Sequence, residues 1–209
     1  MMSCCAFFLR RPRTAAVGLL AVVCLLLPAP LLASRPDIVW ISAGHASNLN
    51  AVAFSPDGSM LASCADDGTV KLWRVPDLQF IRSFVAKAGW VKAVAFSPDG
   101  QMLASAHSEN VIKLWRVSDG ALLRTLTGHT SSVYAVAFSP DGETVASGGG
   151  DAKVRLWKAS TGESLRILSM PAVVRAVAFS PDGESVAVAG SSGILRICPT
   201  SGGTTYRGF

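Results

Sequence analysis

Two sets of side chains in this sequence have the composition of a hydrolase triad. The sets are His45, Ser63 and Asp67, and His129, Ser147 and Asp151. In a triad the serine attacks, the histidine takes its proton and the aspartate orients the histidine, all at one site. Here the trio recurs, each time beside a tryptophan, Trp73 or Trp157, whose indole N–H can bond to it. The recurrence indicates a structural brace, and we predict no catalytic residues.

The elements that position these side chains are copies of one unit. The string AVAFSPDG occurs four times without change, beginning at Ala51, Ala93, Ala135 and Ala176, with steps of 42, 42 and 41 residues. A fixed period in this range indicates one supersecondary unit copied in series, each burying its apolar face on the next. The 209-residue chain is therefore expected to hold four such units after a different first segment.

The first unit contains four short strand patterns separated by turn residues. The strands are expected over 49–55, 60–65, 70–75 and 80–85. The first has apolar residues at consecutive positions, which is typical of a strand buried on both faces. Pro56, Asp57 and Gly58 favour a tight turn after it. Four antiparallel strands make a sheet too small to be stable alone, so the sheets must stack on each other, and radial stacking gives a propeller.

These residues carry a family resemblance. The order Gly-His, FSPDG, Ser, Asp-Gly and Lys-Leu-Trp resembles the WD40 (WD-repeat) β-propeller family from Ile38 to about Phe209. The dipeptide that names the family reads Trp73-Arg74, Trp115-Arg116 and Trp157-Lys158, at a second position that is often variable. The resemblance implies an all-β propeller of four-stranded antiparallel blades over residues 34–209, with blades at about 44–85, 86–127, 128–168 and 169–209.

In that family a tetrad of Trp, Ser or Thr, His and Asp links the strands of a blade. The resemblance assigns His45, Ser63, Asp67 and Trp73 to the first blade and His129, Ser147, Asp151 and Trp157 to the third. The second blade keeps Ser105 and Trp115 but has Lys87 for His and Glu109 for Asp, and the fourth has Val188, Ser192 and Cys198. We expect the fourth blade to be the loosest and the second intermediate. His107, outside this pattern, is expected to be solitary and solvated.

The number of units does not decide whether the sheets close into a ring. Family members usually have about seven blades, in a class that ranges from roughly four to eight. The segment 38–41 (IVWI) has the pattern of a fourth strand and is expected to latch onto unit four in preference to 204–209 (TTYRGF). The alternatives are a tight four-blade ring, an eight-blade ring formed by two chains, and a piece of a longer propeller. We favour association or truncation, because an open arc exposes an apolar face and an unpaired edge.

The first 33 residues have the order of a secretory signal peptide. Arg10, Arg11 and Arg13 precede an apolar run over 15–27, and Pro28 and Pro30 end it. The run is shorter than the roughly 20 residues that cross a bilayer. The alternative is an uncleaved signal anchor, since the candidate cleavage sites fit poorly. Either way the body is expected to be exported, to a periplasmic, extracellular or lumenal location, with the membrane contacted only through an uncleaved anchor.

Charge and cysteine content narrow the function classes. Without the first segment sixteen basic and fourteen acidic residues remain, a net charge of +2 with no basic run, so no nucleic-acid partner is expected. Cys64 and Cys198 are too few for a disulfide framework and are expected as small buried hydrophobes. The turn aspartates Asp57, Asp99, Asp141 and Asp182 are interpreted as turn formers, because calcium needs several converging oxygens. No metal or cofactor is expected.

Positions that differ among the near-identical copies are candidates for recognition. The residue before each AVAFSPDG is Asn50, Lys92, Tyr134 or Arg175, and two positions earlier the second copy has Trp90. By resemblance these positions open onto one rim of the propeller, where partners of the family dock. Aromatic and cationic residues are enriched in interface hot spots. The alternative is drift of solvent-facing residues among duplicates.

These observations favour a non-catalytic, exported scaffold that binds protein partners through its rim loops. A channel-based enzyme or small-ligand binder needs converging acids, histidines or metal ligands on the innermost strands. Those strands read NAVAFS, KAVAFS, YAVAFS and RAVAFS and offer no such cluster. A remnant of a larger propeller is the third alternative, kept by the low repeat count. The sequence names neither the partner nor the pathway.

Overall fold

The computed structural model describes residues 44–85, 89–193, 195–202 and 207–208. All of them belong to one compact unit, Val39–Phe209. The expected signal segment 1–33, the strand pattern at 38–41 and Lys87 lie outside the described residues. In the described part of the chain no helix is long and apolar enough to span a bilayer.

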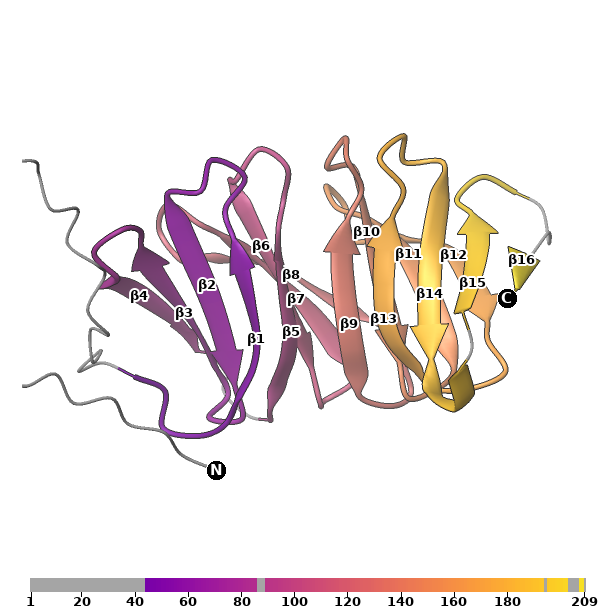
Figure 1. The fold of residues 1–209 in the computed structure, drawn as a ribbon, viewed down its shortest axis with the longest axis horizontal. Helices are drawn as coiled ribbons and strands as arrows, with labels where there is room; N and C mark the ends of the chain where they lie inside the picture. Colours follow the sequence, from indigo (N-terminus) through magenta and orange to yellow (C-terminus); the bar gives the residue numbers. More distant parts are fainter. Residues whose placement is uncertain (1–43, 86–88, 194, 203–206, 209) are drawn as a thin grey trace, which may run out of the picture. The chain divides into compact units, whose positions relative to one another are not determined.

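The strands form four antiparallel sheets, each built from strands that follow one another in sequence (Figure 1). The first sheet contains β1 (Leu49–Phe54), β2 (Met60–Ala65), β3 (Thr69–Arg74) and β4 (Gln79–Val85). The second contains β5 (Val91–Phe96), β6 (Met102–His107), β7 (Val111–Arg116) and β8 (Leu122–Thr127). The third contains β9 (Val133–Phe138), β10 (Thr144–Gly149), β11 (Lys153–Lys158) and β12 (Ser164–Ser169). The fourth contains β13 (Val174–Phe179), β14 (Ser185–Gly190), β15 (Leu195–Pro199) and β16 (Arg207–Gly208), with the 3-10 turn η1 (Ser191–Gly193) before β15. The predicted all-β architecture of four-stranded blades is confirmed.

The repeated Ser-Pro-Asp-Gly segment closes the first hairpin of every sheet. In the first sheet the Ser55 hydroxyl donates to Asp57 at 2.6 Å, and the amide of Ser59 donates to the same carboxylate at 3.0 Å. Gly58 has a φ of 71°, which favours glycine. The hydrogen bonds, first that from Ser55, lower the pKa of Asp57 to about 2. The other three copies repeat the Ser-to-Asp bond, which identifies these aspartates as turn formers.

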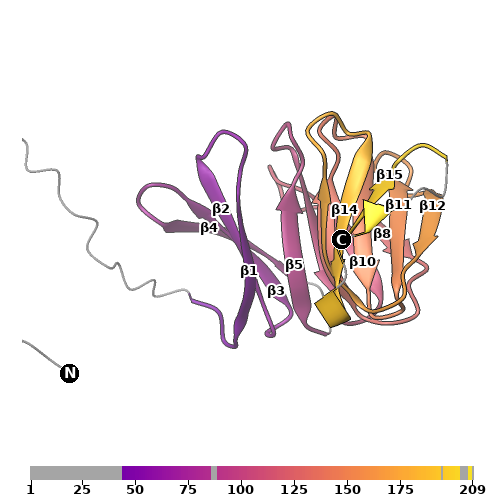
Figure 2. The same ribbon diagram turned by 45° about the vertical axis from the view of Figure 1, so that its right-hand side comes forward.

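Neighbouring sheets pack through their first strands. β1 lies beside β5 (Figures 1 and 2), β5 beside β9, and β9 beside β13 (Figure 1). We call the face of a sheet that packs on the preceding sheet its front face, and the opposite face its back face. Three clusters of buried side chains fill the spaces between sheets. A Cβ added to Gly148 on the back of the third sheet would lie 2.3 Å from Val174 on the front of the fourth, so small residues allow this close approach.

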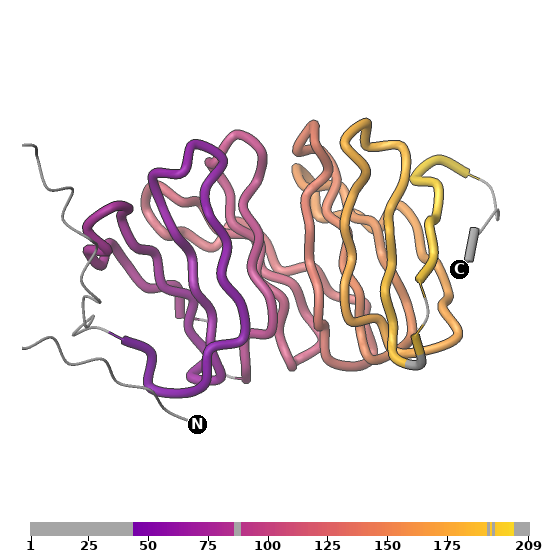
Figure 3. Tube along the Cα trace, in the orientation of Figure 1, coloured from indigo at the N-terminus to yellow at the C-terminus, as the bar shows by residue number. Residues whose placement is uncertain are grey.

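The four sheets do not close into a ring (Figure 3). Leu49 on the front of the first sheet is 61% exposed, whereas the equivalent Val91, Val133 and Val174 are fully buried. On the back of the fourth sheet Ile197 is 39% exposed, whereas the equivalent Leu114 is fully buried. Among the described residues, therefore, nothing covers the front face of the first sheet or the back face of the fourth.

The outer position of the fourth sheet departs from our expectation. There the short strand β16 pairs with β15, with Ile197 opposite Arg207. We expected the segment 38–41 in this place and the C-terminal segment to lose the competition; instead part of 204–209 takes it. The physical reason is proximity, because a short connection joins β15 to β16 and a nearby strand loses little entropy on pairing.

Candidate functional site

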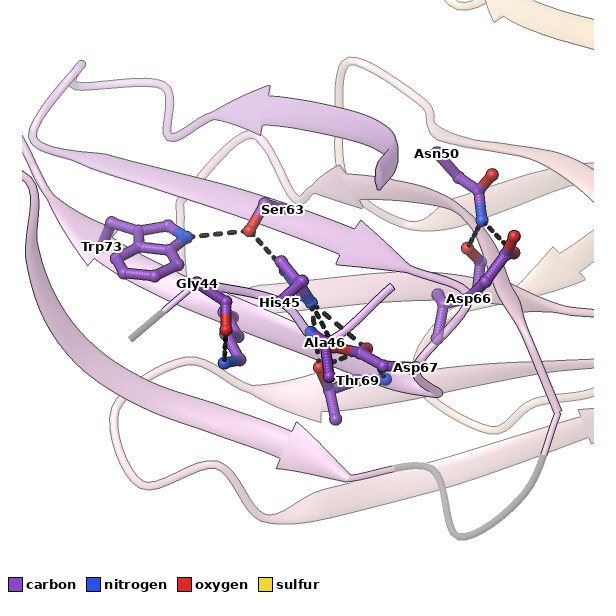
Figure 4. Close-up of polar contacts among 11 residues, drawn as sticks. Gly44, His45, Ala46, Asn50, Ser63, Asp66, Asp67, Thr69 and Trp73 are labelled. Atoms are coloured by element: carbon purple, nitrogen blue, oxygen red, sulfur yellow. Dashed lines mark hydrogen bonds and ion pairs between the residues drawn. The ribbon is translucent and has the colours of Figure 1, made fainter. Parts of the chain in front are cut away.

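The first sheet contains a chain of hydrogen bonds from tryptophan to aspartate (Figure 4). Trp73 Nε1 donates to Ser63 Oγ at 2.8 Å, and Ser63 Oγ lies 2.8 Å from His45 Nε2. His45 Nδ1 lies 2.9 Å from Asp67. A carboxylate only accepts, so Nδ1 carries the proton, and Nε2 is free to accept from the serine hydroxyl. Burial opposes ionisation of Asp67, but bonds from Thr69 and the Ala46 amide outweigh it and lower its pKa to about 2.

The third sheet repeats this arrangement with nearly identical distances. Trp157 Nε1 and His129 Nε2 each lie 2.8 Å from Ser147 Oγ, and His129 Nδ1 lies 3.0 Å from Asp151. Burial lowers the pKa of His129 and prevails over the Asp151 carboxylate, which raises it. His129 is therefore neutral at pH 7, and its Nε2 can accept a hydrogen bond from the Ser147 hydroxyl.

The geometry of these chains resembles a triad, yet their position does not suit attack on a substrate. Ser63 and Ser147 are buried, and in each case the indole N–H of a tryptophan occupies the serine oxygen. A nucleophile must reach a reacting carbon, which this buried oxygen cannot do without moving the tryptophan. The arrangement joins two neighbouring strands, the turn between them and the preceding loop in one network of hydrogen-bonded polar groups.

The second sheet corrects our expectation for His107. This side chain is fully buried, not solvated, and its Nε2 lies 2.8 Å from Ser105 Oγ, which also accepts from Trp115 Nε1 at 2.8 Å. His107 ends β6 at the position that Gly149 holds in the third sheet, where an added Cβ would lie 2.9 Å from His129 Nδ1. A histidine at this strand position therefore reaches the serine from the strand instead of the loop. One signal in the sequence could have indicated this contact. The second repeat has Lys87 where the first and third have a histidine, and the same repeat has a histidine at position 107.

The fourth sheet replaces the polar network with apolar contacts. Val188 and Cys198 are buried at the positions of the serine and the tryptophan. Replacing both partners of a hydrogen bond with apolar groups leaves nothing unsatisfied, which is nearly neutral for stability.

The candidate recognition residues lie at the other end of the first strands from the Pro-Asp-Gly turns. We call Asn50, Asp66, Trp90, Lys92, Tyr134 and Arg175 the rim. At the junction of the first and second sheets, Asp66 accepts from Asn50 at 2.7 Å and from Lys92 at 2.9 Å (the Asn50 contact is drawn in Figure 4). These bonds, first that from Asn50, lower the pKa of Asp66. The Lys92 ammonium also lies 4.3 Å from the centre of the Trp90 ring, and the Trp90 residue is 54% exposed.

The other two junctions are crossed by rim or neighbouring side chains as well. The Ser132 hydroxyl of the third repeat donates to the backbone oxygen of Ser108 in the second. The guanidinium of Arg175, on the fourth sheet, lies 4.3 Å from the centre of the Tyr134 ring on the third. The structure thus joins the predicted rim residues in two groups, Asn50 with Lys92 and Trp90, and Tyr134 with Arg175.

Two further features of the described residues are the grooves between sheets and the two cysteines. Two grooves lie beside the Pro-Asp-Gly turns, one between the first two sheets and one between the second and third. The two grooves occupy equivalent positions between successive sheets. Met60, Arg82 and Asp99 line part of the first, and Asp141 and Lys158 line part of the second. Among the described residues no group of three His, Cys, Asp or Glu side chains is placed to hold a metal ion. Cys64 and Cys198 are both buried and free, in the first and fourth sheets.

Repeated four-stranded antiparallel sheets, stacked through their first strands and braced by Trp–Ser–His–Asp networks, define a protein of the β-propeller class. Residues 48–171 match the model of the fourth β-propeller of WDR90, and residues 162–198 match the WD domain, G-beta repeat. The chain belongs to the WD40 repeat family. Proteins of this family generally act as scaffolds for protein interactions.

Individual relatives match over about one repeat. The chain is 45% identical over 38 residues to the WD40 repeat-containing protein HOS15 of Arabidopsis thaliana, covering 18% of this chain and 6% of that protein. It is 45% identical over 40 residues to ribosome assembly protein 4 of Chaetomium thermophilum, covering 19% of this chain and 8% of that protein. Over 38 residues it is 50% identical to the target of rapamycin complex subunit wat1 of Schizosaccharomyces pombe, covering 17% of this chain and 12% of that protein.

Among solved structures, the WD40 β-propeller domain of Doa1 superposes with a TM-score of 0.68 at 25% identity. The match covers 76% of this chain and 53% of that one. The chain thus spans about half of that propeller domain.

Proposed function

We propose that this protein is a non-catalytic scaffold that binds protein partners through the rim. The observation that carries the proposal is the exposed Trp90 ring, held beside Lys92 at a junction where three polar side chains converge. Trp and Tyr supply large contact area at low entropic cost, and such residues dominate interface energies. Family membership supports the same type of activity.

Substitution of the two aromatic rim residues tests this proposal. The wild-type chain, the double variant Trp90→Ala/Tyr134→Ala and the control Leu165→Ala are immobilised and incubated with extract from the cells that make the protein. Leu165 is an exposed apolar residue outside the rim, on β12. We expect the wild type and the control to retain the same proteins by quantitative mass spectrometry, and the double variant to lose them. An unchanged set of retained proteins with the double variant contradicts the proposal.

We further propose that the first 33 residues direct the chain across a membrane, as a cleaved signal or as an anchor. The arginine cluster followed by an apolar run supports this. Residues 1–33 are fused to a reporter enzyme that is active only in an oxidising compartment, with Arg10, Arg11 and Arg13 changed to Glu as the control. We expect activity with the native segment and a strong reduction with the control, because orientation follows positive charge. An inactive native fusion contradicts export.

A further inference from the structure

The two uncovered faces of the chain are copies of the two sides of its internal interfaces. The uncovered front face carries Leu49, Val52 and Phe54, in register with Val91, Val94 and Phe96 of the second sheet. Val52 is 60% exposed, whereas Val94 is buried. This face therefore carries the same kind of apolar residues that are covered on the front faces of the other three sheets.

The uncovered back face has the same relation to the back faces inside the chain. Leu195 and Ile197 are exposed, in register with Val70 and Leu72 of the first sheet, which are buried against the second. The small residues Ala176 and Ala178 are exposed as well, whereas the equivalent Ala51 and Ala53 pack against the neighbouring sheet.

The pairing of front and back residues is defined by contacts within the chain. A Cβ at Gly148 would meet both Val174, at 2.3 Å, and Val177, at 3.2 Å. The equivalent of Gly148 in the fourth sheet is Ala189, and the equivalents of Val174 and Val177 in the first are Leu49 and Val52. The same register would therefore seat Leu49 and Val52 of one chain over Ala189 of another.

We propose that a second copy of this chain covers these faces, head to tail, so that two chains close one ring of eight sheets. Each interface joins the front of the first sheet in one chain to the back of the fourth in the other. Such heterologous contacts form rings when their rotation closes. Propellers range from about four to eight blades. Two copies of this chain give the upper number of that range, whereas three copies would exceed it. The proposal uses faces distinct from the rim and does not depend on the proposed function.

Two substitutions on opposite faces test this head-to-tail arrangement. Val52→Asp places a charge on the front face, and Ile197→Asp places one on the back face. In a head-to-tail pair, either substitution alone affects both interfaces. A mixture of the two variants, in contrast, contains one pairing in which both sides are unchanged: the back face of the Val52→Asp chain and the front face of the Ile197→Asp chain.

The full chain, as its own cells process it, is measured by analytical ultracentrifugation over a range of concentrations. We expect the mass of two chains for the wild type and for the control Leu165→Asp, which carries its charge on the third sheet. Each single variant should fall to half that mass, with its strand circular dichroism retained, and an equimolar mixture should recover the mass of two chains. A wild type with the mass of one chain or of more than two, a single variant that keeps the two-chain mass, or a mixture that stays at one chain would overturn the proposal.

Discussion

The Nε2 atom of His107 lies 2.8 Å from Ser105 Oγ, the same oxygen that accepts the indole N–H of Trp115. In the first and third sheets the equivalent imidazole comes from the loop before the sheet, as His45 and His129. In the second sheet it comes from the end of β6. A hydrogen bond between an imidazole nitrogen and the buried serine is thus preserved, while the position of the histidine in the sequence changes.

Substituting His107 by Ala tests this replacement. The change removes the imidazole that bonds to Ser105 Oγ and opens a cavity, so we expect the free energy of unfolding to fall by about 2–3 kcal/mol. Glu109→Ala, at an exposed neighbouring position, should change it by less than about 0.5 kcal/mol. Urea denaturation measures both. Equal effects of the two substitutions would show that the contact of His107 with Ser105 does not stabilise the protein.

The same histidine predicts a dependence of stability on pH. Burial, and next the charge of Lys113, lower the pKa of His107 from 6.5 to about 4. Between pH 6.5 and 4 the unfolded chain binds a proton that the native state does not, so stability falls as the pH falls, by up to about 3 kcal/mol in total. Above pH 6.5 this contribution does not change with pH. Denaturation curves of the wild type and His107→Gln should converge as the pH is lowered from 7 to 4, and a constant difference would contradict the assignment.

Equivalent positions in the third and fourth sheets have opposite requirements. Ser147→Ala leaves the Trp157 N–H and the His129 Nε2 buried without a partner, so we expect a loss of about 2–3 kcal/mol. Val188→Ser places a hydroxyl in an apolar cluster that includes Cys198 and should cost about 1–3 kcal/mol. Thermal unfolding checks both values. Stabilisation by Val188→Ser would mean that the fourth sheet retains a polar network.

The close approach of the third and fourth sheets predicts that Gly148 tolerates no side chain. Gly148→Ala places a Cβ 2.3 Å from Val174, on the body of a buried side chain. Overpacking of this kind typically costs about 1–3 kcal/mol. Gly202→Ala, which meets nothing within 4 Å, should be close to neutral in the same denaturation assay. A neutral Gly148→Ala would show that the sheets can separate without cost.

The two buried thiols are expected to be inert in the native protein. Burial raises the pKa of Cys64 to about 12 and also raises the pKa of Cys198. Since the thiolate is the reactive form, iodoacetamide at pH 8 should modify both residues at least tenfold more slowly in the native state than in denaturant. Peptide mapping by mass spectrometry distinguishes them from the other cysteines. Rapid native labelling of Cys64 would show that the first sheet opens away from the second.

The strands of this fold follow closely from the sequence, because hydrophobic spacing and turn residues are local signals. The sequence pattern predicts the third strand over 70–75, and the strand spans Thr69–Arg74; the turn at Pro56 and Gly58 has the predicted form. The tetrads of the first and third sheets follow from the resemblance to the WD40 family, whose bonding pattern could be carried onto these residues one by one.

Contacts between repeats were less accessible to sequence reasoning. His107 bonds to Ser105 as the loop histidines bond to Ser63 and Ser147 in the first and third sheets, and no window within one strand shows that. The bond from Lys92 to Asp66 joins two repeats, and its partner could be named only once the packing of the sheets was known.

Contacts between Asp66 and Lys92 and between Tyr134 and Arg175 connect one copy of the unit to the next. Duplication of such a unit therefore adds a new boundary as well as a new copy, and each boundary presents its own chemistry to the solvent. One changed side chain at a boundary alters what two adjacent copies display together, while the strands beneath keep their sequence. A gene that grows by copying can diversify its surface in this way without redesigning its interior.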